Sequence, residues 1–161
     1  MMQSLPRTLL LLLLALPFSP FLSSGSPSAY EMLEKFNFPK GILPQGVKSY
    51  RLEQDGGFEV VLYGECEFHV DGGYLLKYRR RITGKAKSGQ LKELDGVSVK
   101  VILVWFGISE VDRSGSNLLF YVGPLSASFP LSNFEECPNC RCGSGCAAAG
   151  AADPAALVSD V

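Results

Sequence analysis

Histidine is almost missing from this chain, because His69 is the sole histidine among 161 residues. A metal site built from several imidazoles is therefore excluded, and any Ser-His-Asp arrangement would have to use His69. The chain also lacks the Gly-x-Ser-x-Gly motif of many hydrolases and the Gly-Lys-Ser/Thr order of phosphate-binding loops. We therefore expect no metal, no nucleotide and no other cofactor, and we expect a protein that is not an enzyme.

The chain also has no large excess of positive or of negative charge. Lysine and arginine number 15 against 16 for aspartate and glutamate, which leaves a net charge of -1. Such a balance argues against a general nucleic-acid binder, whose surface needs a clear basic excess. Beyond the N-terminal region, no apolar run approaches the length of about 20 residues that a transmembrane helix needs.

The first residues have the layout of a signal peptide. Arg7 is the only charge before Glu31, and the short apolar run 9–16 is followed by prolines and by small residues around Gly25. We expect cleavage near Gly25, which makes 1–25 a signal peptide and the protein secreted or resident in the endomembrane system. An uncleaved N-terminal anchor is the alternative.

The remaining chain predicts a mainly β domain over 26–135. Ser28 and Glu31 form a capping box ahead of one short helix, 29–36. Asp55-Gly56-Gly57 and Asp71-Gly72-Gly73 then mark two tight turns between alternating segments. About seven short strands are expected, in an antiparallel, strongly twisted sheet or barrel with the helix packed on or inside it.

The segment 97–106 is apolar or β-branched at most positions, including Val99, Val101 and Trp105. A continuous apolar run of this length predicts a central strand that is buried on both faces. The last clear strand is expected at 118–122.

One strand carries a group of basic residues. Within 74–83, Lys77, Arg79 and Arg81 share a face, while Arg80 falls on the opposite, apolar face. These four are the candidate ligand-binding residues, because a basic stripe can contact the phosphates of lipids. A solvated face that prevents sheet aggregation is the simpler interpretation of the stripe. Arg80 would need either a lipid head group or, more simply, a buried carboxylate.

His69 alternates with Glu65 and Glu67 on the polar face of its strand. A solvated sheet histidine is the simpler interpretation, and a catalytic base is the alternative.

Five cysteines suggest disulfide chemistry. Cys137, Cys140, Cys142 and Cys146 are crowded within ten residues, and Cys66 lies alone on an apolar strand face. In a secretory compartment the four are expected to form two bridges within the tail, leaving Cys66 as a buried free thiol. A zinc site is a cramped alternative, and a bridge from Cys66 into the tail is another. Beyond Cys146 the chain is alanine-rich, so we expect a disordered tail over 136–161 without a lipid anchor.

The order of several short motifs resembles a plant family called domain of unknown function 538. The motifs are, in chain order, Gly41-Ile42-Leu43-Pro44-Gln45-Gly46-Val47, Tyr50-Arg51-Leu52, Gly57-Phe58-Glu59-Val60, Cys66, Tyr78, Ile82-Thr83-Gly84, Gly89, Leu94-Asp95-Gly96-Val97-Ser98-Val99-Lys100, Trp105, Tyr121-Val122-Gly123, Ser126-Ala127-Ser128-Phe129-Pro130 and Phe134. The resemblance implies a small plant protein with a β-rich fold likened to the lipid-binding domain of bactericidal/permeability-increasing proteins. It also implies roles in stress or growth responses.

Together these observations favour a binder of a lipid or another amphiphile, with peripheral membrane contact, over two alternatives. One alternative is an esterase-like hydrolase that acts on chlorophyll or a similar ester, with His69 as its base. The other is a signalling or cell-wall protein that acts through a protein partner.

Overall fold

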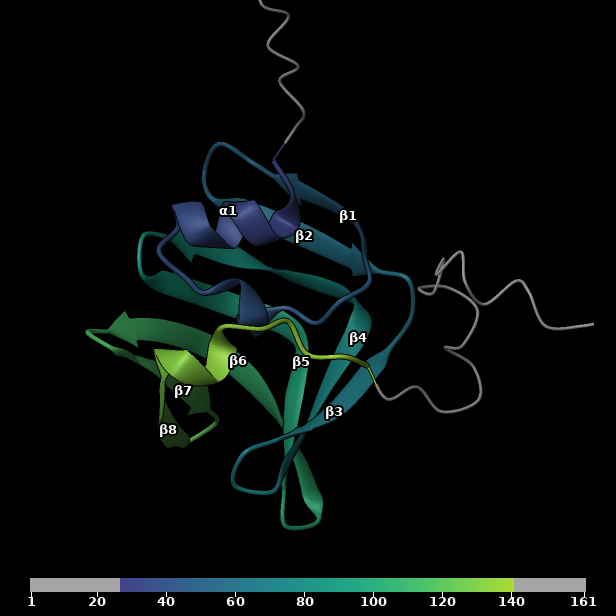
Figure 1. Ribbon diagram of the computed structural model, residues 1–161, viewed down its shortest axis with the longest axis vertical. Helices are drawn as coiled ribbons and strands as arrows, with labels where there is room; N and C mark the ends of the chain where they lie inside the picture. The colour runs from purple at the N-terminus through teal and green to yellow at the C-terminus, as the bar shows by residue number, and fades with distance from the viewer. Residues whose placement is uncertain (1–26, 141–161) are drawn as a thin grey trace, which may run out of the picture.

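Antiparallel strands joined by tight turns make up most of the computed structural model, which describes residues 27–140 (Figure 1). The helices and strands are α1 (Ala29–Lys35), η1 (Lys40–Ile42), β1 (Val47–Leu52), β2 (Gly57–Leu62), β3 (Cys66–Val70), β4 (Tyr74–Lys87), β5 (Gln90–Val101), β6 (Val104–Ser114), β7 (Asn117–Val122), β8 (Leu125–Pro130) and η2 (Leu131–Phe134), where η denotes a 3-10 helix. No helix within residues 27–140 has both the length and the apolar character needed to cross a membrane.

The predicted capping box starts α1. The Ser28 hydroxyl accepts a hydrogen bond from the Glu31 amide at 3.2 Å, and the Glu31 carboxylate accepts one from the Ser28 amide at 2.6 Å. These two bonds satisfy donors that a helix start otherwise leaves unpaired. Ala29, Met32 and Leu33 are buried, so the helix presents one apolar face to the sheet.

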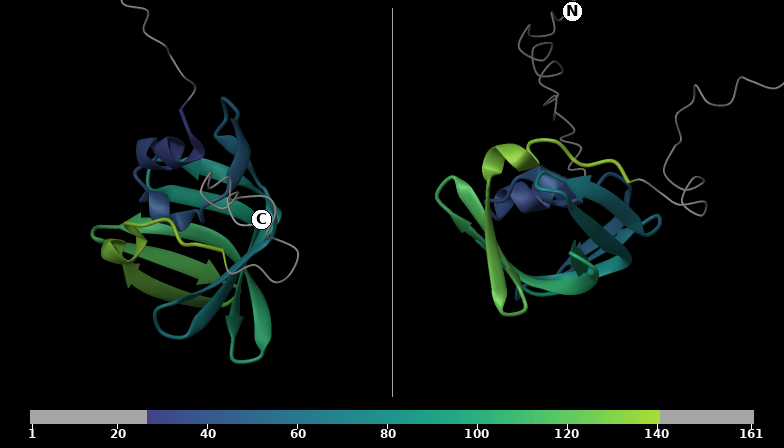
Figure 2. Two further views of the ribbon diagram at one scale, coloured as in Figure 1. Left: turned by 45° about the vertical axis from the view of Figure 1, so that its right-hand side comes forward. Right: turned by 90° about the horizontal axis from the view of Figure 1, so that it is seen from below.

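The eight strands form one antiparallel sheet, which confirms the predicted fold class with one more strand than expected. Pairing runs β1-β2-β4-β5-β6-β7-β8, and β3 pairs with β4 off this path. Besides β5, the 14-residue β4 is long enough to pair with two further strands: its 81–85 segment pairs with β2, and its 74–78 segment pairs with β3. The sheet is curled (Figure 2), but β1 and β8 do not pair within the described residues, so it is open.

The core fills the concave side of this curled sheet. Phe38, Leu62, Val111 and Leu118 are each at most 2% exposed, and α1 and η1 add side chains at the end near β1. Figure 1 places α1 at one end of the molecule and the turn between β5 and β6 at the other.

The expected central strand over 97–106 is wrong. β5 ends at Val101 and β6 begins at Val104, so the run folds back on itself as a hairpin whose tip is Ile102 and Leu103. The two tip residues are 90% and 81% exposed. Hydropathy alone cannot distinguish a buried strand from two strands joined by an apolar tip, and no glycine or proline marks this turn.

Candidate ligand-binding cavity

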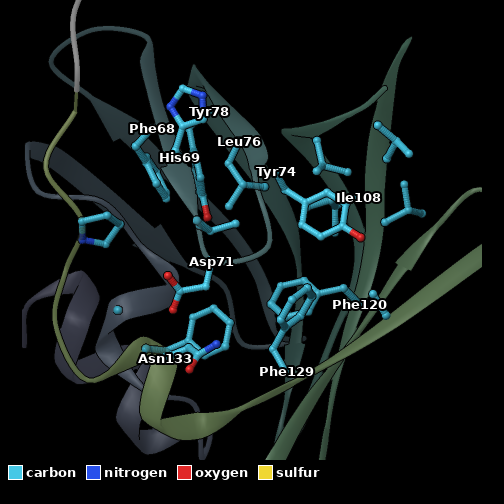
Figure 3. Close-up of a pocket in the computed structure, with 18 of the residues that line it drawn as sticks. Phe68, His69, Asp71, Tyr74, Leu76, Tyr78, Ile108, Phe120, Phe129 and Asn133 are labelled. Carbon is cyan, nitrogen blue, oxygen red and sulfur yellow. The ribbon is translucent and has the colours of Figure 1, made fainter. Parts of the chain in front are cut away.

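A cavity of about 410 Å³ lies inside the curl of the sheet (Figure 3). This volume falls within the range of about 300–1,000 Å³ that small-molecule sites occupy. Apolar and aromatic side chains from β3 to β8 and from η2 form most of its wall. They are Phe68, Val70, Tyr74, Leu76, Tyr78, Val99, Val101, Ile108, Phe120, Val122, Leu125, Ala127, Phe129 and Phe134.

Aromatic rings pack against one another along one side of the cavity. The Phe120 ring centroid is 5.8 Å from that of Phe129 and 5.6 Å from that of Phe134. Tyr74 meets Phe129 edge to face at 6.3 Å. Such contacts fix the ring orientations, so this part of the wall is preformed for an apolar ligand.

The Tyr78 hydroxyl is already hydrogen-bonded within the fold and is not free to bind a ligand. Its side chain is buried and donates a hydrogen bond of 2.7 Å to the Ile42 carbonyl oxygen. Burial raises the pKa of Tyr78 well above its ordinary value, so the hydroxyl stays protonated and keeps η1 tied to β4.

Polar side chains are few, and those of His69, Asp71 and Asn133 lie to one side of Phe120 and Phe129 (Figure 3). His69 and Asp71 come from the end of β3 and the turn after it, Asn133 comes from η2, and Glu136 follows η2. The rim thus carries the Asp71 carboxylate and the Asn133 amide, which can hydrogen-bond the polar end of an amphiphile, whereas the His69 imidazole points away from the cavity (Figure 3).

His69 is exposed, as strand alternation predicted, and its imidazole forms no hydrogen bond or ion pair within residues 27–140. Its neighbours Glu65 and Glu67 both lie near the Lys77 ammonium, at 3.4 and 3.3 Å. The two carboxylates therefore form ion pairs with Lys77 on the sheet surface. Hydrogen bonds to Glu67 and Glu65 raise the pKa of Lys77.

The basic candidates lie on the outer face of β4 and do not line this cavity. Besides the Lys77 cluster, Arg79 pairs with Asp95 at 2.6 Å, and Arg81 pairs with Glu59. These ion pairs with carboxylates of neighbouring strands neutralise the positive charge of the basic stripe. Ion pairs that are exposed to solvent contribute little to stability.

Arg80 was expected on the apolar face and is instead exposed. The reason is an irregularity in the β4–β5 pairing: Tyr78 pairs with Val97 and Thr83 pairs with Asp95, so four residues of β4 face one residue of β5. A bulge of this kind bends the strand and re-aims its side chains.

The expected disulfides within the tail are also wrong for Cys140, which bonds to Cys66. The Cα atoms of the two residues lie 4.9 Å apart although 74 positions separate them in the chain. Cys66 is therefore not a free thiol. Cys137 is the free cysteine among the described residues, and burial raises the pKa of its thiol. Cys142 and Cys146, with most of the predicted tail and the whole signal peptide, lie outside residues 27–140.

Residues 135–140, which we name the C-terminal strap, run back across η1 and reach Cys66. The Gln45 amide donates a hydrogen bond of 3.0 Å to the Pro138 carbonyl oxygen. Gly41 lies directly against the backbone of Phe134 and Glu136, where any side chain would collide with carbonyl oxygens. The strap contributes Glu136 and Pro138 to the cavity wall. Sequence reasoning did not identify the residues that line the cavity, because its wall combines residues from six strands and no local pattern reports such a combination.

Comparison with known proteins identifies relatives whose function is not described. The family model described as "Protein of unknown function, DUF538" matches residues 29–135. An uncharacterised protein of Arabidopsis thaliana is 24% identical over 94 residues. The match spans 58% of this chain and 55% of that relative, so the chain spans about half the length of the relative.

Proposed function

We propose that this chain, which belongs to the DUF538 family of proteins of unknown function, binds a lipid or another amphiphile in its cavity. The observation that carries the proposal is the mainly apolar cavity of about 410 Å³, with the Asp71 and Asn133 side chains at one side. An acyl chain or a similar apolar group would lie against Phe120 and Phe129, and the polar end would lie among the rim residues.

The rim favours a head group that donates hydrogen bonds or carries a positive charge. Asp71 supplies a carboxylate there, and Lys77, Arg79 and Arg81 of β4 are engaged in ion pairs on the outer face. An anionic head group alone would meet like charge at this rim. A zwitterionic lipid such as lysophosphatidylcholine, whose choline is cationic, is therefore the best first probe.

We also propose that the protein works in the secretory pathway. The Cys66–Cys140 disulfide supports this location, because disulfides persist in oxidising compartments and are rare in the cytosol. The layout of residues 1–25 agrees with the same location.

Native mass spectrometry tests the binding. The purified protein is incubated with lysophosphatidylcholine below its micelle concentration, and separately with a plant lipid extract. We expect a bound lipid that survives desalting and that an unrelated β-rich protein of similar size does not retain. Recovery of no ligand from either incubation would count against the proposal.

A pair of variants on β8 locates the binding site. Ala127 lines the cavity, whereas its neighbour Ser128 does not line it and is exposed. Ala127→Trp should fill the cavity and reduce lipid binding, whereas Ser128→Trp adds the same side chain outside it and should leave binding intact. Equal effects of the two variants would argue that lipid binds elsewhere.

The hydrolase alternative makes a different prediction for the exposed His69. A hydrolase would convert chlorophyll or a fluorogenic ester, and the His69→Ala variant would lose that turnover. A binder would retain its ligand unchanged, and His69→Ala would alter affinity only.

A further inference from the structure

The tip of the β5–β6 hairpin exposes more apolar side chain than any other part of the described chain. Ile102 is 90% and Leu103 81% exposed, and beside them Val104 is 55% and Trp105 39% exposed. Figure 1 shows this hairpin projecting from the end of the sheet opposite α1. Single exposed apolar residues are ordinary, but four consecutive ones on a projecting tip indicate contact with an apolar partner.

The backbone at this tip adopts a conformation that isoleucine rarely takes. Val101 pairs with Val104, so Ile102 and Leu103 form a two-residue loop, and φ of Ile102 is 59°. Glycine is favoured at a positive φ in such loops, because a β-branched side chain crowds the backbone there. A bulky apolar residue at this position works against local folding preference and points to a contact made by its side chain.

Apolar surface continues from the tip into the cavity. Val101, directly before the tip, lines the cavity. Tyr74 and Leu125 also line it, and they are 36% and 53% exposed. Tyr74 lies near the tip because β4 and β5 pair there, with Leu75 opposite Lys100. A ligand that leaves the cavity along these side chains therefore contacts apolar groups on its way to the tip.

The aromatic ring and the charge beside the tip favour a lipid bilayer as the partner. The Lys100 ammonium lies 5.9 Å from the centroid of the Trp105 ring, and Lys100 is the only charged residue between Asp95 and Glu110. Tryptophan is enriched at the head-group level of membranes, and lysine keeps its stem in apolar surroundings while its ammonium reaches phosphates.

The shape of the tip agrees with this choice. A stable protein interface buries about 800 Å² on each partner, which a two-residue loop does not provide by itself. A projecting tip enters a fluid bilayer without needing a complementary surface.

We propose that the β5–β6 hairpin tip inserts into the interfacial layer of a phospholipid bilayer and brings the cavity to the membrane surface. This inference rests on the proposed function, since an amphiphile of low solubility exchanges most readily with a membrane in direct contact. Asp71 lies on the turn between β3 and β4 next to this region, so the contact needs no excess of anionic lipid and extends to neutral phosphatidylcholine.

Trp105 reports on the contact directly, because it is the only tryptophan in the chain. The protein, in the form that its host cell makes from the full chain, is mixed with phosphatidylcholine vesicles at physiological salt. We expect the Trp105 emission to shift to the blue, brominated acyl chains to quench it, and the protein to float with the vesicles. Protein that stays in solution with unchanged emission would overturn the proposal.

The variant Ile102→Gly with Leu103→Ser separates membrane contact from folding. It places glycine at the positive φ, so the hairpin should fold at least as stably, but both apolar tip side chains are gone. We expect vesicle partitioning to fall by at least about tenfold. Leu52→Ser is the matched control, because Leu52 is 41% exposed on β1, away from the tip, and should partition like the wild type.

Further outcomes distinguish this proposal from the cavity proposal. Dimerisation that is lost in the tip variant, without vesicle binding by the wild type, would show that the tip contacts protein and would overturn the membrane contact. A tip variant that binds lysophosphatidylcholine in solution but not vesicles supports the membrane contact. If the wild type binds vesicles through the tip but retains no lipid in solution, the cavity proposal fails and the membrane contact stands.

Discussion

Removal of the Cys66–Cys140 disulfide should strongly destabilise the domain. The bridge joins residues 74 positions apart, so it closes a loop that includes β3 to β8. The chain-entropy model gives roughly 4–5 kcal/mol for a loop of this length, because the bridge restricts the unfolded chain. At about 4 °C for each kcal/mol in a domain of this size, Tm should fall by roughly 15–20 °C.

The perturbation is Cys140→Ser, which removes the bridge at the partly exposed strap and leaves the buried Cys66 in place. Calorimetry and urea unfolding, each with and without reductant, measure the change. Reductant should lower the Tm of the wild type toward that of Cys140→Ser and should have a much smaller effect on the variant.

Cys137→Ser is the matched control. Cys137 lies three positions earlier on the same strap, and its thiol donates a weak hydrogen bond to the Lys40 carbonyl oxygen at 3.6 Å. Its replacement should cost less than about 1 kcal/mol. If Cys140→Ser lowered Tm no more than Cys137→Ser, the disulfide assignment would be refuted. Replacing all four tail cysteines by serine should likewise cause a large loss of stability, whereas bridges confined to the tail would lead us to expect almost none.

Three further substitutions test how the cavity and its surroundings are held together. Gly41→Ala should cost about 1–3 kcal/mol in urea unfolding, because a methyl group would collide with the strap backbone, whereas Gly107→Ala, with nothing within 4 Å, should cost far less. Tyr78→Phe should cost about 1–3 kcal/mol in the same assay, because it leaves the buried carbonyl of Ile42 without its donor. Asp112 has a buried Oδ1 without a hydrogen-bond partner among the described residues, and burial is the main cause of its raised pKa. The folded state therefore holds the Asp112 proton more tightly than the unfolded chain, so ionisation costs stability above the folded-state pKa. Asp112→Asn should raise the free energy of unfolding at neutral pH, and urea unfolding at a series of pH values should show the gain disappearing as the pH falls toward 3.8, the ordinary value.

Local signals predicted the parts of the fold that local chemistry determines. The capping box of Ser28 and Glu31 satisfies helix donors within four residues, so the sequence alone located α1. The turns at Gly56 and at Gly72 and Gly73 have positive φ values that glycine adopts freely, so they too were predictable.

Features set by tertiary packing were not predictable in the same way. The run at 97–106 has isoleucine, not glycine or proline, at the turn position 102. Only the pairing of its first half with its second half shows the hairpin. β8 was missed because its central Ser-Ala-Ser has little apolar alternation, and its register with β7 comes from the short turn at Gly123. The Cys66–Cys140 contact depends on the path of the strap over η1, which no spacing of cysteines reveals.

The two ends of the molecule differ in what holds them. Near α1, the strap, η1 and β3 are joined by a disulfide, by the Tyr78 hydrogen bond and by the close approach at Gly41, so this end is stabilised by covalent and buried contacts. At the opposite end, the β5–β6 tip carries exposed apolar side chains and a positive φ at Ile102, which gain nothing from the fold itself. The cavity lies between, and its wall takes residues from the strap as well as Val101 beside the tip. On the proposed function, a fold that fixes one end of a cavity and leaves apolar residues exposed at the other would exchange its ligand at the exposed end without loosening the core.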